Sequence, residues 1–312
     1  MNLIAEAEHR RVLAQGGDVP EQRPAFALPL TEVGIAGKTV WVELPQGRLP
    51  FNARLTVDLE ANRRGIHMSR LEEVITDLYR RPFADLRAYA LALGREMLRL
   101  QNGRRGRVEL VGRIPLLRQG VISRRQSLDT VTISVAARFA RQEGGEIAAT
   151  AMIGVEACHI TACPCTQVYN QELFGLTGVP CPLPTHSQRS ATRLEIEAAG
   201  TSPTYEDLLN CLEAALHVTH DLLKRPDEAE MVLKSHRAPQ FAEDAVRDTA
   251  LVVGRAFGGS LPPASRIVIE SLSLESIHIH DVLCRLECTL AEILAVGGFV
   301  PSAAPPSPHS AA

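Results

Sequence analysis

Apolar and polar residues alternate along several stretches of the chain, and this alternation predicts β-strands. Between residues 52 and 60, Ala53, Leu55, Val57 and Leu59 occupy every second position, which is typical of a strand with one buried face. The same analysis predicts further strands over residues 26–42, 107–117, 127–141, 146–160, 191–197, 266–274 and 283–293.

Other stretches repeat their apolar residues every three to four positions, and this period predicts α-helices. Ser69 is the expected N-cap of one helix, with Glu72 completing a capping box and Pro82 ending the helix. Ser202 is the expected N-cap of another helix, with Pro203 at its first position. The remaining helices are expected over residues 84–100 and 239–257.

These elements follow the order β-β-α-α-β-β twice, on either side of a turn at Gly144 and Gly145. We therefore expect an α+β protein whose two modules each hold a four-stranded antiparallel sheet with two helices on one face. Because the other face also needs burial, the sheets are expected to close into barrels by oligomerisation. The expected division is a flexible arm, two modules and a disordered tail, at residues 1–25, 26–143, 146–295 and 301–312.

Composition describes a globular protein and excludes some classes of partner. Hydrophobic residues make up 45% of the 312 positions and charged residues 22%, and the formal net charge is −3. This charge gives no general attraction to nucleic acid or to an anionic membrane, and no apolar run reaches the roughly 18 residues of a membrane-spanning helix. Since the N-terminal residues lack a signal-peptide pattern, we expect a cytoplasmic protein in which the seven cysteines are reduced.

Three cysteines and a histidine lie within residues 158–165, and this segment ends in Cys163-Pro164-Cys165. A thiolate is a soft metal ligand and also a nucleophile, so the pair indicates a metal site or a catalytic site. The alternative is a turn that holds two buried thiols. His186 follows after a loop rich in Pro and Gly, and its place just before a strand modestly favours a ligand over a structural histidine.

His278 and His280 are separated by one residue, so their side chains would point the same way on an extended chain. Two such imidazoles can supply a metal ligand and a proton shuttle. The alternative is a histidine pair on a solvated strand face.

A charged segment around residue 226 allows two interpretations. Lys224 and Arg225 suit phosphate groups, and Glu228 suits a metal. A solvated helix end with charges matched to the helix dipole is the simpler interpretation from the sequence alone.

Two further segments offer groups for a nucleotide. Glu243 lies early in a predicted helix, and its two carboxylate oxygens match the two N–H donors on the edge of guanine. A basic loop that contains His67 and Arg70 runs into a predicted helix N-terminus, which makes it a weak candidate for an anion site.

These motifs together resemble one family. Their order along the chain is Gly-Ile-His-Met-Ser-Arg, Ala-Cys-Pro-Cys, Thr-His-Ser-Gln-Arg-Ser, Leu-Leu-Lys-Arg-Pro-Asp-Glu, Phe-Ala-Glu-Asp and Glu-Ser-Ile-His-Ile-His-Asp. In this order they resemble the type IB GTP cyclohydrolases, including their archaeal relatives of the methanopterin pathway. The resemblance covers about residues 28–295.

The resemblance implies the tunnelling fold, a homotetramer and a divalent metal bound between subunits. By motif, the implied metal ligands are Cys163, His186, Glu228 and either His278 or His280. Glu243 would bind guanine, and Cys165 would lie near the reaction centre with the catalytic Cys163, His278 and His280. The basic candidates for the triphosphate are Lys224, Arg225, His67 and Arg70.

The implied reaction converts GTP and water to formate and 7,8-dihydroneopterin triphosphate, the first step of pterin and tetrahydrofolate-type biosynthesis. The metal would activate the water that attacks C8 of the purine, and the His278–His280 pair would deliver protons. Iron(II) is favoured because the long loop from Cys165 to His186, which contains Cys181, is similar to that of iron(II)-dependent archaeal relatives; manganese(II) or zinc(II) also suit the ligands. The alternatives are a dihydroneopterin 2′,3′-cyclic phosphate product, or a non-catalytic protein of this fold with a structural metal.

Overall fold

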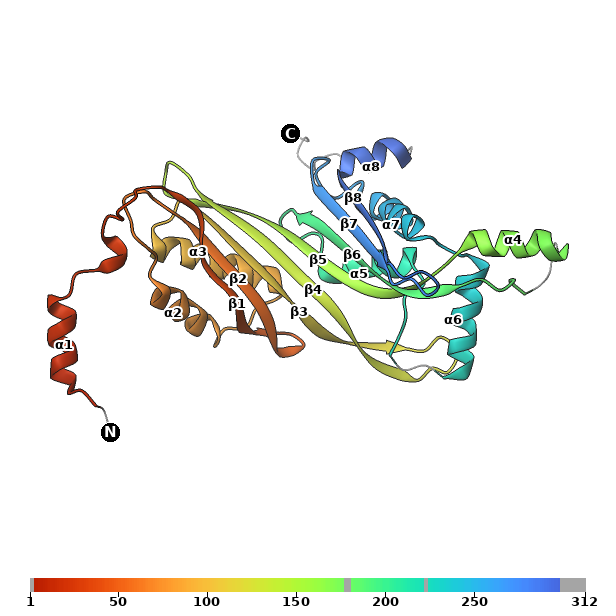
Figure 1. Cartoon of the computed structure of the whole chain (residues 1–312), viewed down its shortest axis with the longest axis horizontal. Coiled ribbons are helices and arrows are strands. Elements are labelled where there is room, and N and C mark those ends of the chain that lie inside the picture. Colours follow the sequence, from red (N-terminus) through yellow and green to blue (C-terminus); the bar gives the residue numbers. More distant parts are fainter. Residues whose placement is uncertain (1–2, 177–180, 222–223, 298–312) are drawn as a thin grey trace, which may run out of the picture.

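The computed structural model of the chain describes residues 3–176, 181–221 and 224–297 (Figure 1). Within these residues, eight strands form one antiparallel sheet in which each strand pairs with the next strand along the chain. The strands are β1 (Leu30–Leu44), β2 (Gly47–Leu59), β3 (Arg105–Gln119), β4 (Gln126–Arg141), β5 (Ile147–Ala162), β6 (Ser187–Ala198), β7 (Arg266–Ser273) and β8 (Val282–Thr289).

The continuity of this sheet corrects the expectation of two separate four-stranded sheets. β4 and β5 pair from Thr132 opposite Glu156 to Arg141 opposite Ile147, so the two halves share one sheet. The turn between them is tight, because the N–H of Gln142 donates to the carbonyl of Glu146 at 2.8 Å. Gly145 has a φ of 84°, which glycine adopts at little cost. The division into two modules and the closure into barrels stay predictions.

Helices cover one face of the sheet (Figure 1). In the first half, α2 and α3 pack on it, and α3 contacts β3 and β4. In the second half, α5 contacts β5 while α7 contacts β7 and β8. The helices of the described residues are α1 (Glu6–Gln15), η1 (Val19–Glu21), α2 (Met68–Leu78), α3 (Leu86–Gln101), α4 (Pro164–Phe174), α5 (Tyr205–Ala215), α6 (Arg225–Arg237), α7 (Ala242–Phe257) and α8 (Leu290–Gly297).

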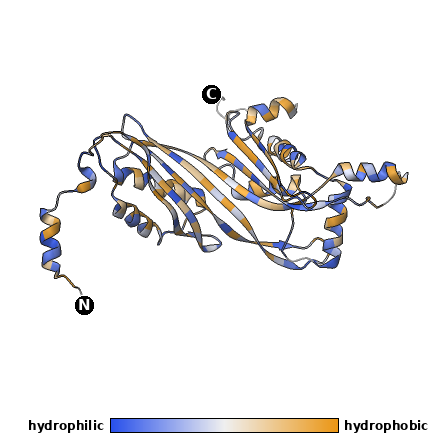
Figure 2. Cartoon of the chain, in the orientation of Figure 1, coloured by the Kyte–Doolittle hydropathy of each residue, from blue (hydrophilic) through white to orange (hydrophobic). Residues whose placement is uncertain are grey.

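The predicted alternation along the strands is confirmed (Figure 2). In β4 every second residue is buried toward the helices, at Val131, Ile133, Val135, Ala137 and Phe139. The opposite face carries charged side chains that pair across neighbouring strands. Three such pairs are Arg54 with Glu32 at 2.7 Å, Arg193 with Glu270 at 3.3 Å, and Arg285 with Glu270 at 3.2 Å. The core therefore lies between the sheet and the helices, while the charged face remains open.

Two predicted helix starts are wrong. His67 precedes α2 and Ser69 lies inside the helix, so Ser69 and Glu72 form no capping box. α5 begins after Thr204, whose hydroxyl oxygen accepts from the N–H of Asp207 at 3.1 Å. Ser202 lies before this cap, and its bond to the following proline is cis. In both cases a serine near the helix was mistaken for the residue that caps it.

Helices also occur where strands or loops were expected. α4 follows Cys163 directly, α6 adds a third helix between β6 and β7, and α8 replaces the end of the last predicted strand. β8 ends at Thr289, where the carboxylate of Glu292 accepts from the N–H of Thr289 at 2.7 Å and starts α8. The arm expected to be loosely held contains α1, which buries none of its residues. The predicted tail at 301–312 lies outside the described residues.

No helix among the described residues is long and apolar enough to cross a membrane. The structure leaves all seven cysteines as free thiols. Of the three cysteines in apolar patterns, Cys211 is buried, and burial raises its pKa to about 11. Cys284 and Cys288 are half-buried.

Candidate active site

Cys163 and His186 meet where two neighbouring strands come together at one end of the sheet. β5 ends at Ala162, opposite Ser187 at the start of β6. The N–H of Cys163 donates to the carbonyl of His186 at 3.1 Å. The hydroxyl of Thr185 donates to the carbonyl of Cys163 at 2.6 Å. Two motifs that are distant in the sequence are therefore direct backbone neighbours.

Cys163 is the residue that precedes α4, and its side chain is half-buried. Pro164 occupies the first helical position, where a missing N–H costs nothing. Cys165 lies in the first turn and is exposed. The Cys-Pro-Cys segment is therefore the junction between a strand and a helix.

His278 and His280 come from the connection between β7 and β8, not from a strand. Their rings nevertheless stack, with centroids 5.5 Å apart and an interplanar angle of 18°. The ring of His186 lies edge-on to His278, with a centroid distance of 6.2 Å. The structure thus brings three predicted histidines into one group, here called the histidine cluster (His186, His278 and His280).

Gln188 and Glu275 support the histidine cluster, and the sequence analysis assigned no role to either. The Nδ1 atom of His186 lies 3.2 Å from Oε1 of Gln188. The Nε2 atom of Gln188 donates to Oε1 of Glu275 at 3.1 Å and to the hydroxyl of Ser273 at 3.2 Å. Gln188 belongs to the Thr-His-Ser-Gln-Arg motif, and Glu275 begins the Glu-Ser-Ile-His-Ile-His motif. Their closeness to the histidines in the sequence was the one indication of this supporting role.

Glu228 lies away from this group in the single chain. It is exposed in the first turn of α6, where its N–H donates to the carbonyl of Lys224 at 2.9 Å. The opposite end of α6 contacts α4, because Nε2 of Gln167 donates to the carbonyl of His236 at 2.7 Å. Glu228 and His236 are eight positions apart on α6, which corresponds to a rise of about 12 Å along the helix. The segment predicted as a helix end is therefore a helix start, some distance from Cys163.

Asp227 holds this start of α6 against the β3–β4 hairpin. Its Oδ1 atom accepts from the N–H groups of Ile122 and Ser123 at 2.9 and 3.1 Å. Hydrogen bonds from the hydroxyl of Ser123 and from these N–H groups lower the pKa of Asp227 to about 2. Lys224 and Arg225 flank this anchored turn and are exposed, so they are free to meet an anion.

Glu243 lies in the first turn of α7, as its place early in a predicted helix implied, and it is exposed there. It lies close to Cys284 on β8: burial is the main cause that raises the pKa of Cys284, and the negative charge of Glu243 adds to it. Asp244 caps the same helix by accepting from the N–H of Phe241 at 3.0 Å. Glu243 itself is thus free of a capping role.

His67 and Arg70 lie in the first half of the chain, at α2, which is at the opposite end of the long axis from α4 and α6 (Figure 1). His67 Nε2 lies 3.0 Å from Oε1 of Glu21 and 3.5 Å from Oδ2 of Asp18. Arg70 donates to the carbonyl of Leu100 at 3.0 Å. A single chain therefore does not bring these two residues to Cys163, and their binding to triphosphate stays a prediction.

The predicted metal ligands do not form a complete site within the chain alone. Among the described residues, the one group of three His, Cys, Asp or Glu side chains with ligand atoms within 4.8 Å of one another is Asp18, Glu21 and His67. Exposed acids of this kind are common without an ion. Cys163 and the histidine cluster thus offer sulfur and nitrogen donors at one end of the sheet, and Glu228 remains apart.

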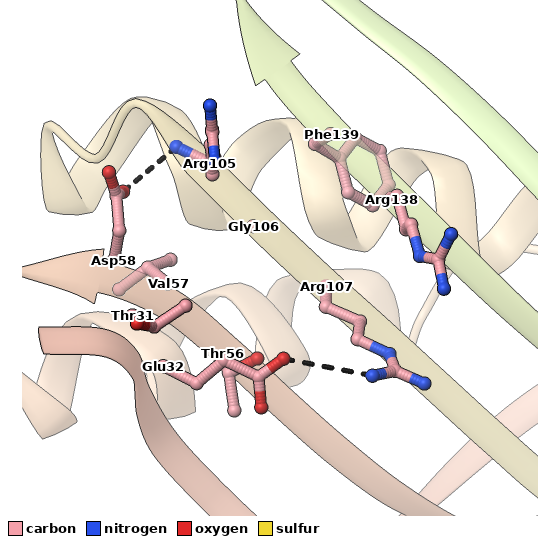
Figure 3. A pocket seen from close by; sticks show the side chains of 10 residues that line it. All are labelled: Thr31, Glu32, Thr56, Val57, Asp58, Arg105, Gly106, Arg107, Arg138 and Phe139. Atoms are coloured by element: carbon pink, nitrogen blue, oxygen red, sulfur yellow. Dashed lines mark hydrogen bonds and ion pairs between the residues drawn. The ribbon is translucent and has the colours of Figure 1, made fainter.

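Two cavities add information about charge. The cavity in Figure 3, of about 320 Å³, lies over the first half and contains none of the predicted site residues; Glu32 there lies 3.7 Å from Arg107. A second cavity, of about 270 Å³, lies where β4 and β5 separate. Its lining includes Arg113 and Arg189, and no ion pair involves either residue among the described residues. Arg189 belongs to the Thr-His-Ser-Gln-Arg motif, although no role was expected for it.

Comparisons with known proteins agree with the motifs. The family model described as type I GTP cyclohydrolase folE2 matches residues 17–284. GTP cyclohydrolase MptA 2 of Methanocella arvoryzae is 31% identical over 303 residues, which covers 88% of this chain and 97% of that protein. GTP cyclohydrolase MptA of Methanococcoides burtonii is 27% identical over 307 residues, which covers 90% of this chain and 96% of that protein.

A solved structure extends the likeness to the fold. The uricase from Arthrobacter globiformis superimposes with a TM-score of 0.50 at 8% identity, covering 85% of this chain and 96% of that one. This likeness concerns the mixed α/β architecture with its antiparallel sheet, and at this identity it carries no information on the reaction.

Proposed function

Because the chain belongs to the type I GTP cyclohydrolase folE2 family, we propose that it converts GTP and water to formate and 7,8-dihydroneopterin triphosphate with a divalent metal. The observation that carries this proposal is the meeting of Cys163 and the histidine cluster at one end of the sheet. The type IB assignment made from the motifs, the place in pterin biosynthesis and the homotetramer are part of the same proposal.

The donor set fits a divalent transition metal. Cys163 offers a thiolate, the histidine cluster offers imidazoles, and Glu228 offers a carboxylate; these donors suit iron(II), manganese(II) or zinc(II). The residues that would hold the ion are Cys163, His186, Glu228 and His278. When bound, the ion supplies a Lewis acid that makes water reactive at neutral pH. Since Glu228 lies apart in one chain, we propose that neighbouring copies complete the site.

Side chains of the protein would transfer protons and bind the guanine base. His280 and His278 stack at the surface, where they can exchange protons with the opening imidazole ring of the purine. The exposed carboxylate of Glu243 would accept from N1–H and the 2-amino group of guanine. Cys165 is the second residue of α4, and it would lie close to the reacting atoms.

Basic side chains would hold the triphosphate. Lys224 and Arg225 are exposed at the start of α6, where the helix dipole also favours an anion. His67 and Arg70 would reach the same nucleotide only from another copy. Arg113 and Arg189 line the second cavity and extend the set of candidates.

The test is an anaerobic assay of metal-stripped full-length protein with GTP. Iron(II), manganese(II) or zinc(II) is added back in separate reactions, and formate and the pterin product are measured. We expect no formate from stripped protein and release of formate with a divalent ion, largest for iron(II). Absence of formate with every metal, while GTP still binds, would contradict the proposal.

A second candidate product is dihydroneopterin 2′,3′-cyclic phosphate. The feature that favours it is the long segment between Cys165 and His186, because a longer segment beside the proposed site can change how the triphosphate is handled. Phosphate analysis of the pterin separates the two, because the triphosphate retains three phosphates in a linear chain. A non-catalytic protein with a structural metal is less favoured, because His278 and His280 are exposed and structural metal sites are closed.

A further inference from the structure

Two residues beside the histidine cluster, Gln188 and Glu275, are hydrogen-bonded to each other, and Gln188 also contacts the ring of His186. We propose that Gln188 and Glu275 are positioning residues that hold His186 in the tautomer with its proton on Nδ1, so that Nε2 presents its lone pair to a metal. This inference rests on the proposed function, since it assigns His186 as a ligand. It goes further by naming the groups that make His186 competent to bind.

The geometry follows from the register of β6 and β7. Ser190 on β6 lies opposite Ser273 on β7. Gln188 and Glu275 each lie two residues further along, in opposite chain directions, so they emerge on the same face of the sheet and meet. The amide of Gln188 therefore stands between the imidazole of His186 on one side and the carboxylate of Glu275 on the other.

The chemistry of these groups fixes the orientation of the amide. A carboxylate has no proton to donate, so it must face the NH₂ group of Gln188, and the distance is 3.1 Å. The carbonyl oxygen of the amide then faces Nδ1 of His186 at 3.2 Å. An oxygen only accepts, so Nδ1 must carry the proton. With the reverse amide orientation, two acceptors would face each other.

A chain of buried hydroxyls holds Glu275 in place. Ser273 donates to Oε1 of Glu275 at 3.0 Å, so Ser273 can only accept from Thr161 at 3.1 Å. Thr161 in turn accepts from Ser190 at 2.8 Å. Thr161, Ser190 and Ser273 are at most 1% exposed, so no water competes for these bonds. Each hydroxyl thus donates to the next group in the chain, from Ser190 through Thr161 and Ser273 to the carboxylate of Glu275.

Glu275 also ties this chain to the loop that carries the other histidines. Its N–H donates to Oδ1 of Asp281 at 3.2 Å, which closes the loop containing His278 and His280. The same residue therefore orients His186 through Gln188 and shapes the loop that faces it. Outer partners of this kind typically contribute 10- to 100-fold to metal affinity.

The test reads the tautomer directly in metal-free, full-length protein labelled with ¹⁵N-histidine. Magic-angle-spinning NMR distinguishes protonated from unprotonated ring nitrogens in an assembly of any size, and a His186→Asn sample identifies the His186 signals. We expect the Nδ1–H form of His186 in the wild-type protein. Gln188→Leu removes the oxygen that accepts from Nδ1 of His186. Glu275→Gln allows the side-chain amide of Gln188 to flip, because the residue at 275 can then also donate. Both variants should therefore show a mixture of His186 tautomers.

A double variant and a matched control sharpen the test. Gln188→Glu combined with Glu275→Gln exchanges donor and acceptor, so it should restore the Nδ1–H form that Glu275→Gln alone loses. Glu270→Gln makes the same chemical change on β7, but on the opposite face, where Glu270 pairs with Arg193 and Arg285. It should leave the His186 signals unchanged.

Metal affinity provides the second readout, by competition with a chromophoric chelator for zinc(II). We expect about 10- to 100-fold weaker binding for Gln188→Leu and Glu275→Gln, and recovery in the double variant. A wild-type His186 with its proton on Nε2, or one tautomer throughout all variants, would overturn the inference. Neither readout uses GTP, so a protein with the expected tautomers but no formate release would contradict only the proposed function.

Discussion

The N–H of Cys163 lies 3.1 Å from the carbonyl oxygen of His186, one step beyond the last paired residues of β5 and β6. This bond is made by the main chain, so it does not depend on either side chain. The two residues are therefore brought together by the pairing of two strands. Their chemistry can be removed without removing the contact, which makes both residues suitable for substitution.

Replacement of Cys163 by alanine should abolish activity while keeping the fold. Cys163 is half-buried and its backbone bonds remain, so we expect the free energy of unfolding to change by no more than about 1 kcal/mol. Formate release and metal content should both fall by about 100-fold or more, since even outer partners of a metal contribute 10- to 100-fold. Urea denaturation, metal analysis and a formate assay measure the three quantities.

Cys181→Ala is the control for this experiment, because it removes an exposed thiol that has no proposed role. It should leave stability, metal content and formate release close to those of the wild type. Unfolding of Cys163→Ala, with full specific activity in its folded fraction, would instead favour a structural metal.

Replacement of Glu243 by glutamine should weaken recognition of guanine. The carboxylate would accept two hydrogen bonds, and bonds to a charged group contribute about 1.5–3 kcal/mol each. We therefore expect kcat/KM for GTP to fall by about 100-fold or more. Wild-type protein should prefer GTP to ITP, which lacks the 2-amino group, and this preference should shrink in the variant.

The matched control is Glu206→Gln, on the exposed surface of α5. It should leave both nucleotides unaffected. Equal preference for GTP over ITP in wild type and Glu243→Gln would rule out Glu243 as the guanine-binding group.

Buried His159 should make stability fall at acidic pH. It is fully buried, and this burial lowers its pKa from 6.5 to about 4, with the nearby His217 adding to the effect. The unfolded chain therefore takes up the proton first as pH falls. Above pH 6.5 this residue does not lower the free energy of unfolding. Between pH 6.5 and about 4 its contribution lowers the free energy of unfolding by about 3 kcal/mol in total.

His159→Gln removes this titration and can keep the hydrogen bond to Thr192, which is 2.8 Å long in the wild type. Urea denaturation at a series of pH values should show the wild type losing stability relative to the variant across that window. The exposed His9→Gln serves as control and should follow the wild type. Parallel curves for wild type and His159→Gln would refute the assignment.

Replacement of Gly94 by alanine should destabilise the first half of the protein. An added Cβ would lie 2.1 Å from the ring of Phe139, where α3 crosses β4. Overpacking of this kind costs roughly 1–3 kcal/mol, which exceeds the gain of about 1 kcal/mol from the better helix propensity of alanine. Gly144→Ala has open space around it and should be nearly neutral by the same denaturation measurement; equal stability of the two variants would contradict the clash.

The sequence by itself determined which residues face the core and which residues are candidates for the chemistry. Alternation along residues 127–141 predicted the buried face of β4, and the motifs placed Cys163, His186 and the His278–His280 pair in one proposed site. These features are local, because a side chain's direction repeats with the period of its own element. The order of the motifs likewise indicated a GTP cyclohydrolase, which the family model supports.

Tertiary structure alone decided how those elements meet. The single sheet depends on the pairing of β4 with β5, and the support of His186 depends on the register that brings Gln188 to Glu275. The positions of α4 and of Glu228 at the start of α6 were also missed. Such contacts join residues far apart in the chain, and their energy depends on register and on partners that no local pattern records.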